Sequence, residues 1–402
     1  MYILQKNLFS FEQFLEMEPE SKLTGLFKVL ELEPYAKLLR TPSPQGAKGY
    51  NRIAILRAFI AAPLEGIDNF SALNSRLRSD IRLKYYCGFK LTESVPSVSV
   101  FSRVFKQIVE KDLAEKLFYD LVEKCSKEGL IDGSTIAIDS TAIDAYEKKQ
   151  PKKNCKNSEN ATWGAKFDSF KNKLTWFGYK LHLAVDAKSE LPVALEVTSA
   201  HVNDGDVFIP LVKNVLNQKY LNKLNYVLAD AGYDRKKNYE YCLEANAQAI
   251  IPLNARNEKE PPAGFASNGT PKCSMGYEMV YWGHDKKHLK FRCPHVLRKV
   301  DCPYGTQWCS SSNYGMVAKV KVSDDPRRFS MPHRESKGWN ELYKQRTSVE
   351  RCNSRLKEYL TVNDLHLGGI HKVAAYAFIN AIVLLASALA VKNAKTICSE
   401  AA

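Results

Sequence analysis

The segment from Tyr343 to Lys357 constrains the fold and the chemistry of this chain more than any other stretch. It contains no Gly and no Pro, which predicts a helix. At about 100° per residue, one stripe of that helix carries a phenol, a guanidinium, a carboxylate and an ammonium, from Tyr343, Arg346, Glu350 and Lys357. A neighbouring apolar stripe would pack on a core, and it consists of Leu342, Val349, Leu356 and Leu360. An ordinary surface helix with charge pairs four residues apart would show the same pattern.

Two other segments place a carboxylate at the end of a β-like run. Ser134–Thr141 carries Asp139, and Tyr226–Asp234 carries Asp230. In open α/β sheets, ligands bind beyond the carboxyl ends of strands. Three carboxylates from two strand ends and a helix can therefore converge to hold two divalent cations.

The order and spacing of these residues resemble a known family, the DDE transposases of bacterial insertion sequences. The spacing Tyr343-x2-Arg346-x3-Glu350-x6-Lys357 matches in full the YREK signature of that family. Two segments resemble its first and second acidic motifs, in the same order: Ile138-Asp139-Ser140-Thr141 and Ala229-Asp230-Ala231-Gly232-Tyr233-Asp234. The resemblance covers roughly residues 50 to 390. It implies metal-dependent DNA cleavage at the ends of an element and transfer of the freed 3′-hydroxyls to target DNA.

The same resemblance implies a role for each signature residue. Asp139, Asp230 and Glu350 would hold two Mg2+ or Mn2+ ions, because these cations prefer hard oxygen ligands. We expect Asp139 to bridge both ions and the other two acids to complete one site each. The other signature residues would hold backbone phosphates near the scissile bond, namely Tyr343, Arg346 and Lys357. In an ordinary helix, Tyr343 would be a packed aromatic residue and the two cations would form surface salt bridges.

The apolar pattern after residue 130 is typical of an α/β fold. Strands are expected at about 134–139, 176–186, 191–198, 226–230 and 249–253, with helices at 207–216 and 236–247. The polar stretch Gln150–Asn172 is expected to be a loop. This order, followed by the helix that carries Glu350, indicates an RNase H-like mixed sheet with flanking helices, and the resemblance strengthens that expectation.

We expect four parts in the chain. They are a helical N-terminal domain (1–130), the first part of the catalytic core (131–255), a Cys-rich insertion (256–335), and the Glu-bearing and C-terminal helices of the core (336–402). By resemblance, the N-terminal domain would bind the terminal inverted repeats of the element. Its candidate phosphate contacts are Arg52, Arg57, Arg76, Arg78, Arg82, Lys84, Arg103 and Lys106. A solvated face of helices would carry the same residues.

The net charge of +14 favours a polyanionic partner, of which nucleic acid is the commonest. We expect the partners to be the element ends and target DNA, and a dimer or higher oligomer because two ends must be held together. The first residues show no signal peptide. The apolar stretch Ala374–Val391 is interrupted by polar residues, which predicts a buried helix rather than a membrane span. A soluble protein of the bacterial cytoplasm is expected.

Ten cysteines without secretory context indicate free thiols or a metal site rather than disulfides. A structural zinc ion could be held by Cys273, Cys293, Cys302 and Cys309. Three histidines lie near this group in sequence, but no pair of these cysteines has the CxxC spacing typical of zinc knuckles. Zinc and ordinary loop cysteines both remain open at this point.

Several further polar and aromatic residues are secondary candidates. Asp234 would either support the site or cap the following helix, and capping is the expected role. His201 or Asp204 would support the site or cap the next helix. One of Trp163, Trp176 and Trp282 could stack on a flipped base, although core packing explains each of them as well.

Two other functions are alternatives to the transposase interpretation. A metal-dependent nuclease of the same fold would use the same acids, and a domesticated DNA-binding protein would no longer cut. The signature stripe and the N-terminal helical domain favour a transposase over a nuclease. The intact set Asp139, Asp230 and Glu350 disfavours a protein that only binds DNA.

Overall fold

The computed structural model describes residues 11–16, 21–39, 49–151, 160–167, 172–254, 260–334, 336–364 and 366–400. The chain forms two compact units. The helical unit comprises Met1–Leu130, Asp144–Lys149 and Arg355–Ala402, and the sheet unit comprises Ile131–Ile143 and Gln150–Ser354. Residues after Ser354 therefore belong with the helical unit, rather than with the catalytic core as expected from the sequence.

The helical unit is built from short helices and one long one, which confirms the expected helical N-terminal region. The short helices are α1 (Phe11–Glu16), α2 (Lys22–Lys28), α3 (Glu33–Leu38), α4 (Arg52–Leu64), α5 (Phe70–Ser79), α6 (Ile81–Tyr86), α7 (Val98–Glu110) and α8 (Leu113–Lys127). Side-chain caps explain two of the starts. Asn69 accepts a hydrogen bond from the backbone N–H of Ala72 (2.8 Å), and Asp80 accepts one from Leu83 (3.0 Å).

The long helix α13 (Ile370–Glu400) packs against α8, α2 and α4. Helices that are apolar on all sides are buried, and Ala381, Ile382 and Leu385 are fully buried here. The stretch Ile370–Lys395 is long and apolar enough to cross a membrane, but 72% of its most apolar window is buried inside the protein. That burial is typical of a core helix, as the sequence predicted.

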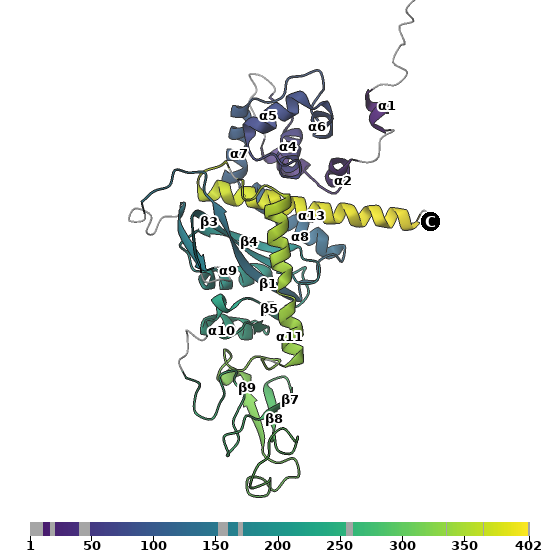
Figure 1. Cartoon of the computed structure of the whole chain (residues 1–402). Coiled ribbons are helices and arrows are strands. Elements are labelled where there is room, and N and C mark those ends of the chain that lie inside the picture. Colours follow the sequence, from purple (N-terminus) through teal and green to yellow (C-terminus); the bar gives the residue numbers. More distant parts are fainter. Residues whose placement is uncertain are drawn as a thin grey trace, which may run out of the picture. The chain divides into compact units, whose positions relative to one another are not determined.

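The sheet unit contains a six-stranded mixed sheet with the order β2-β3-β1-β5-β6, in which β4 also pairs with β3 (Figure 1). Its strands are β1 (Thr135–Asp144), β2 (Thr162–Phe167), β3 (Lys173–Asp186), β4 (Pro192–Ser199), β5 (Tyr226–Leu228) and β6 (Gln248–Ile250). β3 and β4 are antiparallel, whereas β5 runs parallel to both β1 and β6. This mixed arrangement confirms the expected RNase H-like fold.

Four helices flank the sheet. They are α9 (Asp204–Leu216), α10 (Lys236–Glu244), α11 (Lys337–Lys344) and α12 (Thr347–Ser354). α9 packs on β3 and β4, α12 packs on β3, and both α10 and α11 contact β6. These contacts bring α12 to the sheet even though the insertion separates it from β6 in the sequence.

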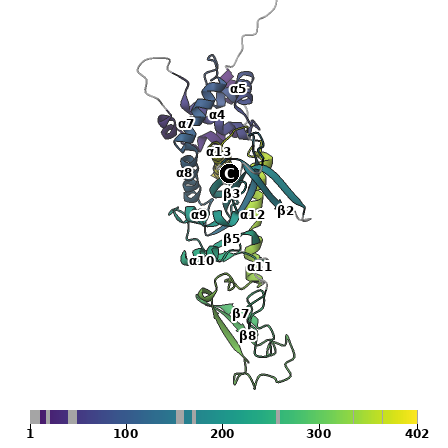
Figure 2. The ribbon, with the colours of Figure 1, turned by 90° about the vertical axis from the view of Figure 1, so that its left-hand side faces the viewer.

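Strand β2 lies within the stretch Gln150–Asn172, so the prediction that this whole stretch is a loop is wrong. It pairs antiparallel with β3, from Thr162 opposite Gly178 to Phe167 opposite Lys173, and extends at the edge of the sheet (Figure 2). A Cβ atom on Gly164 would lie 2.4 Å from the ring of Trp176, so a glycine at this position leaves room for the indole. Residues 152–159 and 168–171 of the stretch lie outside the described residues.

The expected insertion carries a small antiparallel sheet of its own. Its strands are β7 (Val280–His284), β8 (His288–Arg292) and β9 (Val317–Lys321), in the order β7-β8-β9. They cover an apolar cluster made of Met279, Leu289, Phe291, Val322 and Phe329. The expected ends of the insertion, at residues 256 and 335, lie outside the described residues.

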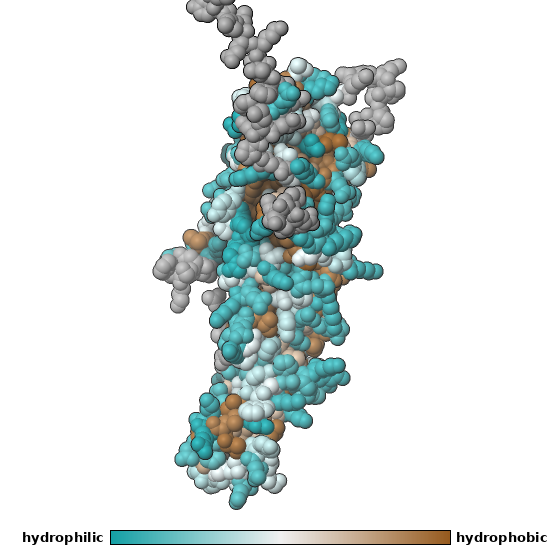
Figure 3. All heavy atoms as spheres, turned by 90° about the vertical axis from the view of Figure 1, so that its right-hand side faces the viewer, coloured by the Kyte–Doolittle hydropathy of each residue, from teal (hydrophilic) through white to brown (hydrophobic). Residues whose placement is uncertain are grey.

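From one side, hydrophilic side chains dominate the surface of the protein, with scattered apolar ones between them (Figure 3).

Candidate active site

Asp139 lies within β1 (Thr135–Asp144), and Asp230 follows the end of the neighbouring parallel strand β5 (Tyr226–Leu228) by two residues. β1 and β5 pair in a register that places Ala137 opposite Leu228. Each acid follows its paired residue by two positions, so both side chains occupy the same level and the same face of the sheet. Adjacent strands are about 4.8 Å apart. The two carboxylates are therefore neighbours. Asp230 follows the end of its strand as predicted, whereas β1 continues to Asp144, so the prediction that Asp139 ends its strand is wrong.

Local backbone groups orient each aspartate. The backbone N–H of Ser140 donates to Asp139 Oδ1 (2.8 Å), and that of Gly232 donates to Asp230 Oδ1 (2.9 Å). Asp230 thereby caps a short 3-10 helix, η2 (Ala231–Tyr233). A Cβ atom on residue 232 would lie 3.0 Å from Asp230 Oδ1, which explains a glycine after this acid.

Glu350 comes to the sheet from α12. Its neighbours Val349 and Cys352 are fully buried, while the Glu350 side chain is 48% exposed. Arg346 Nη2 contacts Glu350 Oε1 at 2.5 Å. The guanidinium also lies 5.8 Å from the centroid of the Tyr343 ring, so one arginine connects the helix acid to the aromatic residue.

The electrostatics link all three acids to Arg346. Burial raises the pKa of Asp139 to about 7; the Ser140 N–H lowers it, the charges of Asp230 and Glu350 raise it, and Arg346 lowers it. Burial also raises the pKa of Asp230, against the lowering effect of the Gly232 N–H and of Arg346. Two adjacent carboxylates resist ionising together. A nearby cation relieves that repulsion, and Arg346 supplies the positive charge in this arrangement.

The donor chemistry of Asp139, Asp230 and Glu350 fits a hard divalent cation, because each offers carboxylate oxygens and the two aspartates repel each other. In the described part of the chain, however, no three Asp, Glu, His or Cys side chains are grouped closely enough to hold a metal ion as they stand. Glu350 is instead paired with Arg346.

The signature segment is not one continuous α-helix, so that part of the prediction is wrong. α11 ends at Lys344, α12 begins at Thr347, and Arg355–Tyr359 forms a π-helical turn. Hydrogen bonds between residues three apart, as in a 3-10 helix, tighten the junction between α11 and α12. The Arg346 N–H donates to the Tyr343 carbonyl (3.0 Å), and the Val349 N–H donates to the Arg346 carbonyl (3.2 Å). No Gly or Pro signals this break.

The predicted phosphate-binding residues divide between the two units. Tyr343 and Arg346 belong to the sheet unit, together with the three acids, whereas Lys357 belongs to the helical unit. Tyr343 stacks on Trp339, with ring centroids 5.0 Å apart and 17° between the planes. Burial raises the pKa of Tyr343, the charge and hydrogen bond of Arg346 lower it, and the charges of Asp230 and Glu350 raise it. Trp339 was not expected from the sequence, which offers only its spacing of four residues from Tyr343.

Asp204 is near the site, but neither Asp204 nor His201 caps α9 with its side chain. The N-cap residue is Asn203, and its side chain makes no capping bond. Asp204 pairs with Lys180 (2.9 Å), and its charge contributes to the raised pKa of Asp230. His201 Nδ1 lies 3.2 Å from the hydroxyl of Thr162. Lys180 is a neighbour of the site that sequence reasoning missed, since it sits inside a strand pattern.

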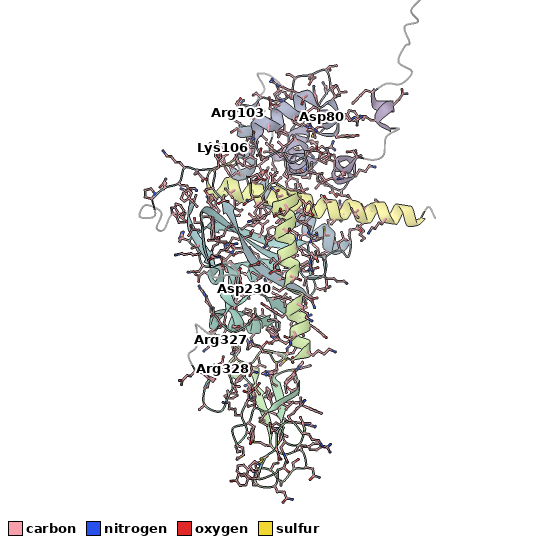
Figure 4. All side chains as sticks on the ribbon, in the orientation of Figure 1. Asp80, Arg103, Lys106, Asp230, Arg327 and Arg328 are labelled. Atoms are coloured by element: carbon pink, nitrogen blue, oxygen red, sulfur yellow. The ribbon has the colours of Figure 1, made fainter. Side chains whose placement is uncertain are left out.

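Asp234 is neither a helix cap nor exposed. The N-cap residue of α10 is Arg235, and the Asp234 side chain is fully buried. Its carboxylate accepts hydrogen bonds from Arg327 Nε (2.9 Å) and Nη2 (2.7 Å), from the Tyr239 hydroxyl (3.0 Å) and from the Asn254 N–H (2.7 Å). Arg327 comes from the insertion and lies near the α10 end of the sheet unit (Figure 4). The expected capping role is therefore wrong.

The four insertion cysteines line one small cavity together with His295. They do not form a metal-holding group of three in the described residues. Cys309 Sγ instead lies 3.4 Å from the carbonyl oxygen of Thr306, and Cys293 is buried against Gly315. The arrangement does not fit the predicted zinc site as it stands, which agrees with the missing CxxC spacing.

The tryptophans differ in their surroundings. Trp163 donates to the carbonyl of Gln150 (2.7 Å) and packs on Phe177, while Trp176 donates to the carbonyl of Tyr179 (3.1 Å). Trp282 is 55% exposed, so the expectation of core packing is wrong for this residue.

In the helical unit, several of the predicted phosphate contacts have partners within the protein. Arg76 pairs with Asp80 (3.1 Å) and Lys106 with Glu110 (3.5 Å). Asp80, Arg103 and Lys106 are labelled in Figure 4. Burial lowers the pKa of Arg52, and the charge of Arg103 lowers it further, which marks two guanidinium groups near each other.

Comparison with known families agrees with the geometry. The family described as "Transposase DDE domain" matches residues 131–386, and the one described as "Transposase domain (DUF772)" matches residues 9–107. The chain is also similar to a solved structure described as a cryo-EM structure of piggyBac transposase synaptic complex with hairpin DNA, at 12% identity and a TM-score of 0.43, covering 93% of this chain and 75% of that one. Because the first family match spans more than half of the chain, this protein belongs to the transposases with a DDE domain.

Proposed function

We propose that this transposase cleaves DNA at the ends of a bacterial insertion sequence and joins the freed 3′-hydroxyls to target DNA in the cytoplasm. The observation that carries the proposal is the shared register of Asp139 and Asp230, with Glu350 brought to the same sheet by α12. No covalent protein intermediate is needed for either step.

Asp139, Asp230 and Glu350 would hold two Mg2+ or Mn2+ ions, which activate the attacking oxygen and stabilise the leaving oxygen. Arg346 would leave Glu350 when the ions bind, and would then be free to hold a phosphate with its bidentate guanidinium. Tyr343, fixed by stacking on Trp339, would hold the same strand through its hydroxyl. Lys357 would contribute a further phosphate contact.

The helical unit would bind the terminal inverted repeats. Arg52 and Arg103 support this role, because a phosphate bound between the two guanidinium groups would offset their mutual repulsion. A dimer or higher oligomer would hold two ends at once.

A cleavage assay tests the proposal. A labelled duplex with the terminal sequence of the element is incubated with Mg2+ or with EDTA, using wild type and Glu350→Gln. Glu341→Gln is a matched control, since Glu341 is an exposed acid on the preceding helix, α11. We expect metal-dependent nicking at the element end by wild type and Glu341→Gln only. End-binding without nicking by the wild type would instead favour a DNA-binding protein that no longer cuts, and nicking without preference for the element end would favour a nuclease.

A further inference from the structure

The sheet of the insertion has one buried face and one open, basic face. On β8, Leu289 and Phe291 are fully buried. Successive side chains of a strand point to opposite faces, so His288, Lys290 and Arg292 point away from that core. On β9, Ala318 and Val320 pack against the core, which leaves Lys319 and Lys321 exposed on the open face. We call His288, Lys290, Arg292, Lys319 and Lys321, with Trp282 and Tyr314, the basic sheet face.

The register of the basic sheet face sets like charges opposite each other. Lys290 pairs across the strands with Lys319, which sets two ammonium groups opposite each other, and the imidazole of His288 pairs with Lys321. Like charges directly opposite each other destabilise a sheet. Asp285 offsets part of the charge, since it lies 3.1 Å from His288 and 3.5 Å from Lys290. Within the described part of the chain, Lys319 and Lys321 form no salt bridge, so this row has no complete counter-charge.

An aromatic platform borders the row of cations. Trp282 and Tyr314 are 55% and 57% exposed. The guanidinium of Arg292 lies 3.8 Å from the centroid of the Trp282 ring and 4.7 Å from that of Tyr314. Cations beside exposed aromatic rings are the combination that holds nucleic-acid strands, because phosphates pair with the charges and bases or sugars stack on the rings.

We propose that the basic sheet face is a DNA-binding surface, separate from the residues that carry out cleavage. The lysines would pair with backbone phosphates without reading sequence, and Trp282 would stack on a base or pack on a sugar. DNA as the ligand rests on the proposed function, but binding at this face does not depend on the acids. The aromatic platform favours DNA over an acidic peptide, which has no stacking groups.

Binding is measured with full-length protein in EDTA, so that failure of cleavage cannot affect the result. The probes are a labelled duplex and a labelled single strand of unrelated sequence, each followed by fluorescence anisotropy over a NaCl series; the single strand offers the free bases that Trp282 would stack on. The test variant is Lys290→Gln/Lys319→Gln/Lys321→Gln. The matched control is Lys213→Gln/Lys219→Gln/Lys223→Gln, which removes the same charge from exposed positions outside the insertion. Circular dichroism verifies that both variants are folded.

We expect the test variant to lose about tenfold or more in affinity, and its slope of log K against log [NaCl] to fall by about 2 to 3. Trp282→Ala should lose about fivefold or more with little change of slope, while Trp282→Phe keeps most of the affinity. Trp308→Ala is the control for loss of an exposed ring in the insertion.

Equal losses in the test and control triples would overturn the proposal, because net charge alone would then explain binding. Unchanged affinity in the test triple would overturn it as well. Unlabelled poly-glutamate and unlabelled DNA of equal charge are also compared as competitors for the basic sheet face. If poly-glutamate displaces the labelled probe more strongly than DNA does, the basic sheet face binds an acidic protein partner instead.

Discussion

Two aspartates of one segment, Asp230 and Asp234, differ in their burial and in the donors around their carboxylates. Asp234 is fully buried, and four donors surround its carboxylate, two of them from Arg327. Asp230 is partly exposed, its Oδ1 accepts the Gly232 N–H, and its pKa is raised by burial. The acids are four residues apart and have the same side chain, so their difference comes only from the surroundings.

The comparison separates a structural acid from one available for chemistry. A buried carboxylate is stable when its lone pairs are satisfied, and Asp234 meets that condition. Asp230 instead lies beside Asp139, where both charges repel each other and oxygens remain for a ligand. In this segment, Asp230 has carboxylate oxygens left for a ligand, and we assign it to metal binding. The oxygens of Asp234 have their hydrogen-bond partners, and this acid binds Arg327 of the insertion.

The largest effect should appear in cleavage by Asp230→Asn. We expect a loss of about a thousandfold or more, because several kcal/mol of transition-state stabilisation depend on the ions that this acid helps to hold. Its thermal midpoint in EDTA should be unchanged or higher, since repulsion with Asp139 is removed. Single-turnover cleavage and thermal unfolding measure both. A lower midpoint with proportional loss of activity would mean that Asp230 is structural like Asp234.

The reverse pattern is expected for Asp234→Asn. Removing this charge leaves Arg327 without its buried partner, and the free energy of unfolding should fall by about 3 kcal/mol. Asp206→Asn serves as the control, because Asp206 also pairs with an arginine, Arg235, but its side chain is 48% exposed. That change should cost less than about 1 kcal/mol. Urea unfolding compares them, and equal losses would contradict the distinction.

A smaller effect is expected from pH. The pKa of Asp139 is about 7 in the folded protein, above its ordinary value near 3.8, so folding favours its protonated form. In EDTA, stability from this group is present below pH 4 and is lost as pH rises towards 7, by about 2 kcal/mol or less. Subtracting the profile of Asp139→Asn from that of wild type isolates the effect. Mg2+ should restore the loss at pH 7, and a difference profile that is flat in EDTA would refute the raised pKa of Asp139, which burial and then the charge of Asp230 cause.

The smallest effect should come from Gly232→Ala. The added Cβ would lie 3.0 Å from Asp230 Oδ1, so the carboxylate must shift by a few tenths of an ångström. We expect cleavage to fall about two- to fivefold, a barrier change of under 1 kcal/mol, with little change in stability. The control is Gly129→Ala, where no atom lies within 4 Å but the backbone is left-handed, which predicts a loss of stability without a specific loss of cleavage. Unchanged cleavage by Gly232→Ala would mean that the cap does not fix the position of Asp230.

The sequence predicted the features whose signals are local. Apolar runs before Asp139 and Asp230 indicated strands, and the structure confirms both strands, although β1 continues past Asp139 to Asp144. Strand β2 was not predicted because Thr162–Phe167 is short, contains Gly164 and lies inside a polar, Lys-rich stretch, although its apolar residues Trp163, Ala165 and Phe167 alternate as in a strand. The turn between α11 and α12 has no Gly or Pro, so packing rather than propensity sets it. The partner of Asp234 is 93 positions away, and no spacing rule reaches that far.

The pairing of Asp234 with Arg327 also bears on how this chain can change over evolutionary time. A deletion that removed the insertion would remove Arg327 and leave the carboxylate of Asp234 without its cationic partner, so the shortened chain would be less stable unless Asp234 changed as well. Two simultaneous events are far rarer than one. Descendants of this chain should therefore keep the insertion even where its outer loops diverge.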